Sequence, residues 1–309
     1  MTTNSARTTR ILATWTAWVV FALFLMPLLG RWEWLYLVCV AATALVVSLM
    51  TPTGLARPAS GASARDVTMV AIFYVTVVGL MRLAFVGFGT DRIPGLFLSF
   101  AAALLVGVLG PVIYTVWIRG RSLGDLGLRR DNWQPTLVMA VLFAGVQFAI
   151  TLWGYALPTP VDWVPLLVMA LVVGIFESIF FRGFIQNRLE ARFGPRLGIA
   201  GAAVLYGAYH VGYGMGITDM AFLTGLGVTY AVAFAVARNI LVLWPLFTPL
   251  GSFYAQLKAG DIELPWASIM GFADVAGVMI AAIWLAHRHE LKRVTTAPRE
   301  HPELQEVRA

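Results

Sequence analysis

Long apolar runs repeat along almost the whole chain and are separated by short polar segments. Each run has roughly 20 residues, the number that an α-helix needs to cross the hydrocarbon core of a bilayer. A membrane β-barrel would instead alternate apolar and polar residues in segments of about 10. The pattern therefore predicts an all-α, polytopic transmembrane helical bundle of about ten spans, with about eight as the lower count. We expect the spans at roughly residues 11–29, 34–50, 67–88, 94–118, 135–156, 163–186, 197–213, 216–236, 240–257 and 266–286.

Composition supports the same fold class. Hydrophobic residues make up 59% of the 309 residues, charged residues only 12%, and the mean hydropathy is +0.79. An ordinary soluble domain has about 25% charged residues, so a soluble fold of this size could not cover its surface. Lipid solvates apolar side chains, while helices satisfy their own backbone N–H and C=O groups. We therefore expect a multi-pass protein of the cell membrane, with the lipid bilayer as its first partner.

The basic residues indicate how the spans are oriented. Of the 22 Lys and Arg residues, 17 fall in the tail and in loops on the same side as the N-terminus, and only Arg31, Arg92 and Lys258 fall in loops on the other side. Cytoplasmic loops carry the excess of positive charge in membrane proteins, so both termini are predicted to be cytoplasmic. The same asymmetry accounts for the net charge of +6, and we expect no nucleic acid partner.

A basic loop divides the chain into two membrane parts. We expect a four-helix N-terminal part over residues 1–118, a cytoplasmic connecting loop over 119–133 and a six-helix core over 134–286. The polar and charged residues 287–309 are predicted to form a cytoplasmic tail. No internal repeat is visible in the sequence, so a transporter built from inverted repeats has no positive support.

A few ionisable side chains lie inside the predicted spans. Each costs about 2.5–3.5 kcal/mol to insert, so each requires a physical reason. Arg82 and Asp274 both fall toward the outer half of the bilayer, and we expect them to form a structural ion pair. Glu177 lies between bulky apolar residues, where a desolvated carboxyl group can serve as a general acid or base.

His210 is the only histidine within a predicted span, and Tyr206 lies one turn before it on the same helix face. The imidazole could orient a water molecule or donate to a developing oxyanion. A buried histidine with satisfied hydrogen bonds is the simpler alternative. At about 1.5 Å per residue, the predicted span ends place Glu177 and His210 roughly 10 Å apart in depth. The sequence therefore leaves open whether the two residues share a site.

Two short motifs contain these residues. The first runs Glu177-Ser-Ile-Phe-Phe-Arg182, and the second is Tyr206 followed four positions later by His210. Their order and spacing resemble the CAAX-protease and bacteriocin-processing family of intramembrane endopeptidases, over about residues 119–257. The resemblance implies hydrolysis of a peptide bond in the membrane without a covalent intermediate. It also implies that Glu177 is the general base, that His210 positions the water or the oxyanion, and that Arg182 orients the site.

The chain departs from the family pattern in two motifs. The first motif has a second glutamate where this chain has Ser178. The third motif pairs a histidine with an asparagine four positions later, and the best register places Thr248 and Ser252 there. Both hydroxyls can donate a hydrogen bond, but neither can act as a base. Because the loss of one oxyanion donor costs about 10²–10³ in rate, a slow protease, a rearranged site and a non-catalytic relative all stay open.

Three functions remain open from the sequence. The first is a glutamate-dependent intramembrane endopeptidase that cleaves a peptide or a lipidated protein. The second is a non-catalytic membrane protein on the same scaffold that binds a lipid, a lipidated peptide or a partner helix. The third is a transporter that uses Glu177, Arg82 and Asp274 as relay charges. No cofactor or metal is expected, because catalytic zinc needs about three protein ligands and the core offers only Glu177 and His210.

Overall fold

The structure, a computed structural model, describes residues 61–151, 170–249 and 265–296, together with a few positions between 34 and 45. The regular secondary structure within these residues is entirely helical, which confirms the predicted all-α class. The helices, in chain order, are α3 (Ala64–Arg82), η2 (Leu83–Phe88), α4 (Ile93–Phe100), η3 (Ala101–Leu109), α5 (Gly110–Ile113), η4 (Tyr114–Ile118), η5 (Leu123–Leu126), α6 (Trp133–Thr151), η6 (Ser178–Gln186), α8 (Asn187–Phe193), α9 (Pro195–Ala208), η7 (Tyr209–Tyr213), α10 (Ile217–Ala237), η8 (Ile240–Val242) and α12 (Pro265–Thr296).

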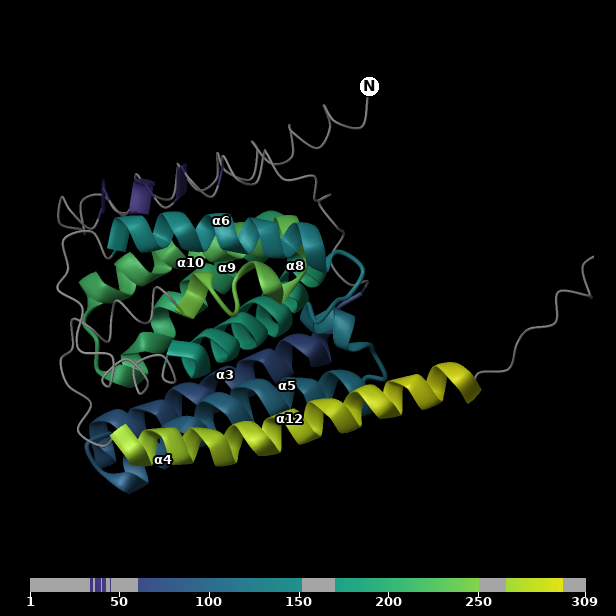
Figure 1. Cartoon of the computed structure of the whole chain (residues 1–309), viewed down its shortest axis with the longest axis horizontal. Helices are drawn as coiled ribbons and strands as arrows, with labels where there is room; N and C mark the ends of the chain where they lie inside the picture. The colour runs from purple at the N-terminus through teal and green to yellow at the C-terminus, as the bar shows by residue number, and fades with distance from the viewer. Residues whose placement is uncertain are drawn as a thin grey trace, which may run out of the picture.

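The helices form two packed groups (Figure 1). One group contains α6, α8, α9 and α10, and within it α9 lies against both α8 and α10. The other contains α3, α4, α5 and α12, and within it α12 runs along η3 and α4. The groups are joined where α3 packs on η7 and where η3 meets η6. The helices that bear the two sequence motifs therefore lie where the groups meet.

Four described helices are long and apolar enough to cross a membrane. They are Ala64–Phe88, Ile93–Ile118, Ala170–Phe193 and Ile217–Ala237. These helices coincide with four of the predicted spans, which confirms a membrane protein. The other predicted spans correspond to helices that do not meet this criterion, or they lie partly or wholly outside the described residues. The total of about ten spans and the orientation of the termini stay predictions.

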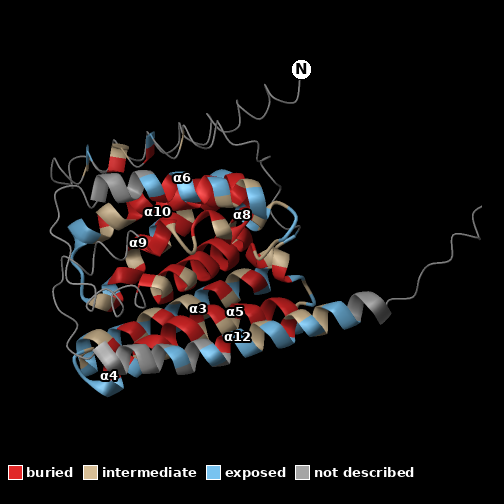
Figure 2. Ribbon diagram, in the orientation of Figure 1, coloured by how far each residue is buried: buried red, intermediate tan, exposed pale blue. Residues whose placement is uncertain are grey.

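Burial separates the central helices from the peripheral ones (Figure 2). In Ala170–Phe193 and in α10, 83% of the most apolar window is buried, against 22% in Ala64–Phe88. The α3 helix accordingly exposes Ile72 and Val75, as expected of a helix that faces lipid. The Ala170–Phe193 helix, which carries Glu177, is therefore at the centre of the described bundle, and it is called the central helix below.

Two glycines allow the close approaches that position the site. A Cβ atom on Gly183 would lie 2.2 Å from the carbonyl oxygen of Leu126, so the η5 segment rests directly on η6. A Cβ atom on Gly207 would lie 1.9 Å from the hydroxyl of Thr224, which sets the contact between α9 and α10. The same Cβ atom on Gly207 would also lie 2.6 Å from the backbone carbonyl oxygen of Met220. Both backbone distances are too short for a side chain, so glycine is required at these two positions.

Arg82 has a partner other than the predicted one. Its Nη1 donates a 2.9 Å hydrogen bond to the backbone carbonyl of Val211, which links α3 to η7. The side chain of Asp274 lies outside the described residues. The predicted pairing of Arg82 with Asp274 is therefore untested, but Arg82 does not depend on it for a hydrogen-bond partner.

Candidate active site

Glu177 lies at the point where the central helix changes from α to π hydrogen bonding. The π segment is η6, and Glu177 is the residue immediately before it. The η2, η3 and η4 segments are π-helical as well, so the change in hydrogen bonding does not by itself mark a functional site. Glu177 is only 4% exposed. A carboxylate taken out of water in this way needs hydrogen-bond donors to be tolerated.

Two tyrosines supply those donors. Tyr206 Oη donates a 3.0 Å hydrogen bond to Glu177 Oε2, and Tyr209 Oη donates a 2.5 Å bond to Glu177 Oε1. The tyrosines are three positions apart at the junction of α9 and η7, so both point from one helix face toward the central helix. Each carboxylate oxygen therefore has one donor and keeps further acceptor capacity, because an ionised carboxylate offers about four lone-pair positions.

Tyr209 was not among the residues predicted from the sequence. The second motif identifies only Tyr206 and His210, and the residue directly before a motif histidine carries no pattern signal. A signal was nevertheless available in the i,i+3 spacing of Tyr206 and Tyr209. Two phenols on one face, opposite a buried carboxylate, are typical donors for it. The shorter of the two bonds to Glu177 comes from the residue that the motif omits.

His210 belongs to the same cluster. Its Nδ1 lies 2.9 Å from the carbonyl oxygen of Tyr206, and its ring centroid is 4.0 Å from that of Tyr209. A carbonyl oxygen can only accept, so Nδ1 carries the proton and Nε2 of the neutral ring is an acceptor. Among the described contacts, no direct bond joins Glu177 to His210. Tyr206 and Tyr209 contact both residues, so Glu177 and His210 belong to one cluster of side chains.

Arg182 packs on this cluster without forming a hydrogen bond through its terminal nitrogens. The guanidinium carbon lies 5.0 Å from the ring centroid of Tyr206, in cation–π range. The side chain is 1% exposed, and within the described part of the chain neither Nη1 nor Nη2 has a hydrogen-bond partner. A buried guanidinium with free N–H groups is costly. Arg182 is therefore a positively charged donor held close to Glu177 and available to a third group.

The two altered motif positions that the structure describes are in contact. Ser178 Oγ and Thr248 Oγ1 lie 3.3 Å apart. Ser178 also donates to the Gly174 carbonyl at 2.7 Å, and Thr248 donates to the Leu243 carbonyl at 3.1 Å. Since each hydroxyl has one proton, Thr248 has none free for a substrate. Ser252, the other candidate donor, lies outside the described residues.

The site shows no sign of a metal centre in the part of the chain that the structure describes. Those residues contain no group of three or more His, Cys, Asp or Glu side chains that could hold an ion. Around Glu177 the neighbours are instead phenols, an imidazole and a guanidinium. These groups can hold a carboxylate, accept from a water molecule and donate to an anion, which are the operations that acid–base hydrolysis uses.

Comparison with known proteins supports the resemblance seen in the motifs. Residues 159–247 match the model of a family described as type II CAAX prenyl endopeptidase Rce1-like. The matched segment contains Glu177, Arg182, Tyr206 and His210 and ends one residue before Thr248. It covers less than half of the chain and is narrower than the expected 119–257. No curated protein and no solved structure matches the chain.

Proposed function

We propose that this protein is a CAAX-protease-type intramembrane endopeptidase in which Glu177 activates the attacking water. The observation that carries the proposal is the convergence of Tyr206 and Tyr209 on the carboxylate of Glu177, with His210 beside them. All four residues lie in the segment that matches the endopeptidase family. The family match supports the reaction class, and the geometry supports Glu177 as the base.

In the proposed reaction, Glu177 accepts one proton of the water while the water oxygen attacks the peptide carbonyl carbon. The tetrahedral intermediate then collapses, and the protonated Glu177 returns the proton to the leaving nitrogen. His210 contributes through Nε2, which accepts from the other water hydrogen and so fixes the orientation of the water. Nδ1 is already bonded to the Tyr206 carbonyl, and this bond holds the imidazole ring in place.

The oxyanion of the intermediate needs donors that the neutral His210 and Thr248 do not provide. His210 presents an acceptor, and Thr248 donates its proton to the Leu243 carbonyl. Arg182 has two terminal nitrogens without hydrogen-bond partners within the described part of the chain, next to the Tyr206 ring. We assign the developing negative charge to Arg182, because a preorganised positive donor in a dry site is the strongest form of oxyanion stabilisation.

The substrate class follows from the family and from the position of the site. The family description names a CAAX prenyl endopeptidase, and a buried site within apolar helices suits a peptide that is anchored by a lipid. We therefore propose a peptide or lipidated protein as substrate.

The proposal includes the topology predicted from the sequence. The protein would cross a cell membrane about ten times, with both termini in the cytoplasm. It would consist of an N-terminal membrane part (1–118), a connecting loop (119–133), a core (134–286) and a tail (287–309).

A non-catalytic role is the second candidate, and one observation favours it. Both Glu177 oxygens already accept tyrosine hydroxyls in a site that is 4% exposed, and Thr248 has no free proton. Such a site could hold a lipidated peptide or a partner helix without cleaving it. The two candidates differ in one observable. Only an endopeptidase produces cleaved peptides or new protein N-termini, and their production should depend on Glu177.

The deciding experiment uses the full chain in proteoliposomes. One arm offers a farnesylated peptide with three residues after the modified cysteine, and its unprenylated counterpart, with the released tripeptide measured by mass spectrometry. A second arm adds a solubilised membrane fraction and identifies new protein N-termini. Wild type is compared with Glu177→Gln, and Glu290→Gln is the control for loss of a carboxylate outside the site. The Glu177 variant should lower kcat/KM by about 10²–10⁴, and the control by less than about twofold.

The outcomes separate the candidates. Cleavage that Glu177→Gln abolishes supports the endopeptidase and its assigned base. Cleavage that survives in Glu177→Gln rejects Glu177 as the base. If the wild-type protein releases no tripeptide and creates no new N-termini, but binds the farnesylated peptide, the non-catalytic role replaces the endopeptidase. A topology test by reporter fusions at the predicted loops checks the orientation, and an extracellular C-terminus would contradict it.

A further inference from the structure

A cluster of charged residues lies at one end of the bundle, away from Glu177. The Ala64–Phe88 and Ile93–Ile118 helices run in opposite directions, so the start of the first and the end of the second lie at the same end. Asp66 lies in the first turn of α3, and Arg119 directly follows η4. Both positions are at the boundary of an apolar span, which is where lipid headgroups meet a membrane protein.

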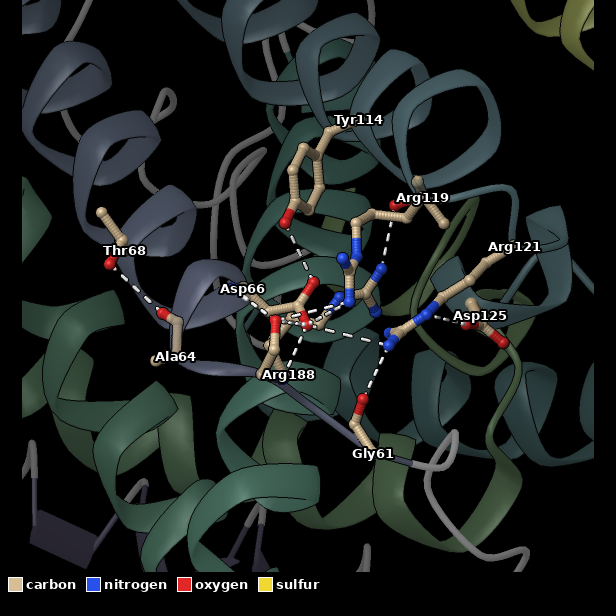
Figure 3. A network of polar contacts seen from close by, with 11 residues as sticks. Gly61, Ala64, Asp66, Thr68, Tyr114, Arg119, Arg121, Asp125 and Arg188 are labelled. Atoms are coloured by element: carbon tan, nitrogen blue, oxygen red, sulfur yellow. Dashed lines mark hydrogen bonds and ion pairs between the residues drawn. The ribbon is translucent and has the colours of Figure 1, made fainter.

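Asp66 is fully buried and already has a full set of donors. Oδ1 accepts from Tyr114 Oη at 3.0 Å. Oδ2 accepts from the backbone and hydroxyl of Ser63, each at 2.8 Å, and from Arg119 Nη2 at 3.2 Å. Arg121 also lies 3.7 Å from Oδ2. Figure 3 shows Arg119 and Arg121 reaching toward Asp66 from the chain that follows η4.

Arg188 is the third guanidinium of this cluster. Asp66 and Asp125 lie near it, but the described part of the chain gives it no ion pair with either. Its Nη2 donates to Thr115 Oγ1 at 2.9 Å, and the group lies over the ring of Phe184. Within the described part of the chain, Nε and Nη1 have no hydrogen-bond partner, and the residue is 1% exposed. Arg119 Nε is likewise buried and unpartnered there. The free donors of two arginines therefore remain in the neighbourhood of a carboxylate whose oxygens are already occupied.

We propose that Arg188, Arg119 and Arg121 form a binding site for a phosphate group at this membrane boundary. A phosphate offers several charged oxygens on one centre, and arginine recognises them with paired N–H groups. A bound phosphate would supply acceptors to the nitrogens that Asp66 leaves unpaired. Neither the endopeptidase reaction nor Glu177 requires this site, so the inference stands independently of the proposed function.

Access to the site is possible through its partly exposed members. The Arg119 and Arg121 side chains are 25% and 18% exposed, whereas Arg188 is only 1% exposed. Arg121 also lies 3.8 Å from Asp125, whose carboxylate borders the site. The phosphate can come from a lipid headgroup or from solution, since both present the same oxygens. The lipid source is consistent with the position of the site at the end of two apolar spans.

The test measures binding to the purified, delipidated full chain in detergent. Native mass spectrometry compares phosphatidic acid with diacylglycerol of the same acyl chains, a pair that differs only in the phosphate. Calorimetry with inorganic phosphate, against chloride at equal ionic strength, tests the soluble source. Arg188→Gln removes the buried donors, Arg188→Lys keeps the charge but removes the paired N–H geometry, and Arg196→Gln removes an exposed arginine elsewhere.

Wild type should bind phosphatidic acid in preference to diacylglycerol. Arg188→Gln should weaken this binding at least about tenfold, since hydrogen bonds to charged groups contribute about 1.5–3 kcal/mol and 1.4 kcal/mol is tenfold. Arg188→Lys should be intermediate, and Arg196→Gln should match wild type. If Arg188→Gln does not fold, Arg119→Lys carries the test, because it keeps the charge beside Asp66 and removes the unpartnered Nε.

Each outcome decides the proposal. Selective binding of phosphatidic acid alone supports the site with a lipid source, and binding of inorganic phosphate as well supports a site open to any phosphate. Equal binding of phosphatidic acid and diacylglycerol, without binding of inorganic phosphate, overturns the proposal. Unchanged affinity in both Arg188→Gln and Arg119→Lys overturns it as well.

Discussion

The hydroxyl oxygens of Ser178 and Thr248 lie 3.3 Å apart, although 70 positions separate them in the chain. These are the two described positions at which the chain departs from the family motifs. The two departures therefore lie in contact with each other. In the predicted register, both positions carry small neutral side chains where the family motifs have a glutamate and a histidine. Each hydroxyl also has a backbone carbonyl as acceptor, so the protons of both hydroxyls are engaged within the protein.

This contact predicts a small effect for Thr248→Val on catalysis. Valine keeps the shape of threonine and removes a hydroxyl whose proton is already engaged. We expect kcat/KM to change by less than about threefold and the free energy of unfolding to fall by about 0.5–1.5 kcal/mol.

Arg182→Gln should instead lower kcat/KM by about 10²–10³, because Arg182 is the proposed oxyanion donor. Peptide cleavage and thermal unfolding in detergent check both variants, and a Thr248→Val protein that folds but is inactive would contradict the assignment.

Tyr209→Phe tests the shorter of the two bonds to Glu177. The variant removes a donor to a buried carboxylate, and a bond to a charged group contributes about 1.5–3 kcal/mol to stability. The loss of orientation at Glu177 should also lower kcat/KM by about tenfold, which corresponds to about 1.4 kcal/mol in the barrier.

Tyr74→Phe is the matched control for Tyr209→Phe. It removes a neutral 3.0 Å bond from a phenol to the Leu205 carbonyl, which does not involve Glu177. A neutral bond contributes about 0.5–1.5 kcal/mol, and activity should be retained. Equal destabilisation of the two variants would mean that the Tyr209 bond is not charge-assisted.

Gly183→Ala tests the contact between η5 and the central helix. The new methyl group would meet the Leu126 carbonyl at 2.2 Å, and this backbone atom cannot rotate away. We expect a loss of about 1–3 kcal/mol in the free energy of unfolding, as for other overpacked sites. Gly79→Ala in α3 has nothing within 4 Å of the new atom, so it should be neutral or stabilise the helix by about 0.5–1 kcal/mol. Chemical unfolding of both variants gives the comparison.

Arg238→Gln tests a buried ion pair on the side of the bundle near α8. Arg238 pairs with Glu190 and also donates to the Asn187 side chain at 2.9 Å. Glu190 is fully buried, so removing its cation leaves an uncompensated charge and should cost about 3–5 kcal/mol. The matched control is Arg129→Gln. Its partner Asp131 is 60% exposed, so the control should cost less than about 1 kcal/mol. Similar losses in the two variants would contradict the role of burial.

The fold class was predictable because it depends on composition more than on contacts. A chain that is 59% hydrophobic and 12% charged can only be solvated by lipid, and apolar runs of about 20 residues can only span as helices. The bounds of the described spans followed within a few residues at most ends. Two helices are longer than predicted: the helix at Ala170–Phe193 was predicted to end at residue 186, and α12 continues to Thr296 although its span was predicted to end at residue 286. Polar residues after Gln186 suggested a loop, but Asn187, Arg188 and Glu190 are buried in tertiary contacts that keep them helical.

The site was predictable only in its residue types. Glu177, Arg182 and His210 stand out in the sequence because charged groups are rare in apolar spans. Their partners could not be read from it. The donors to Glu177 come from 29 and 32 positions away, and which phenols reach it depends on how α9 is rotated and how deep it lies against the central helix. The tautomer of His210 depends in the same way on a carbonyl one turn before it.

The sequence by itself therefore determined a helical membrane protein with an endopeptidase-like pair of motifs, since hydropathy and residue spacing are local properties. The tertiary structure alone decided that Glu177 is held by two tyrosines, that Ser178 contacts Thr248, and that Arg188 lies beside a fully engaged Asp66. Hydrogen bonds are short and directional. Their partners are consequently fixed by the packing of helices that are distant in the chain.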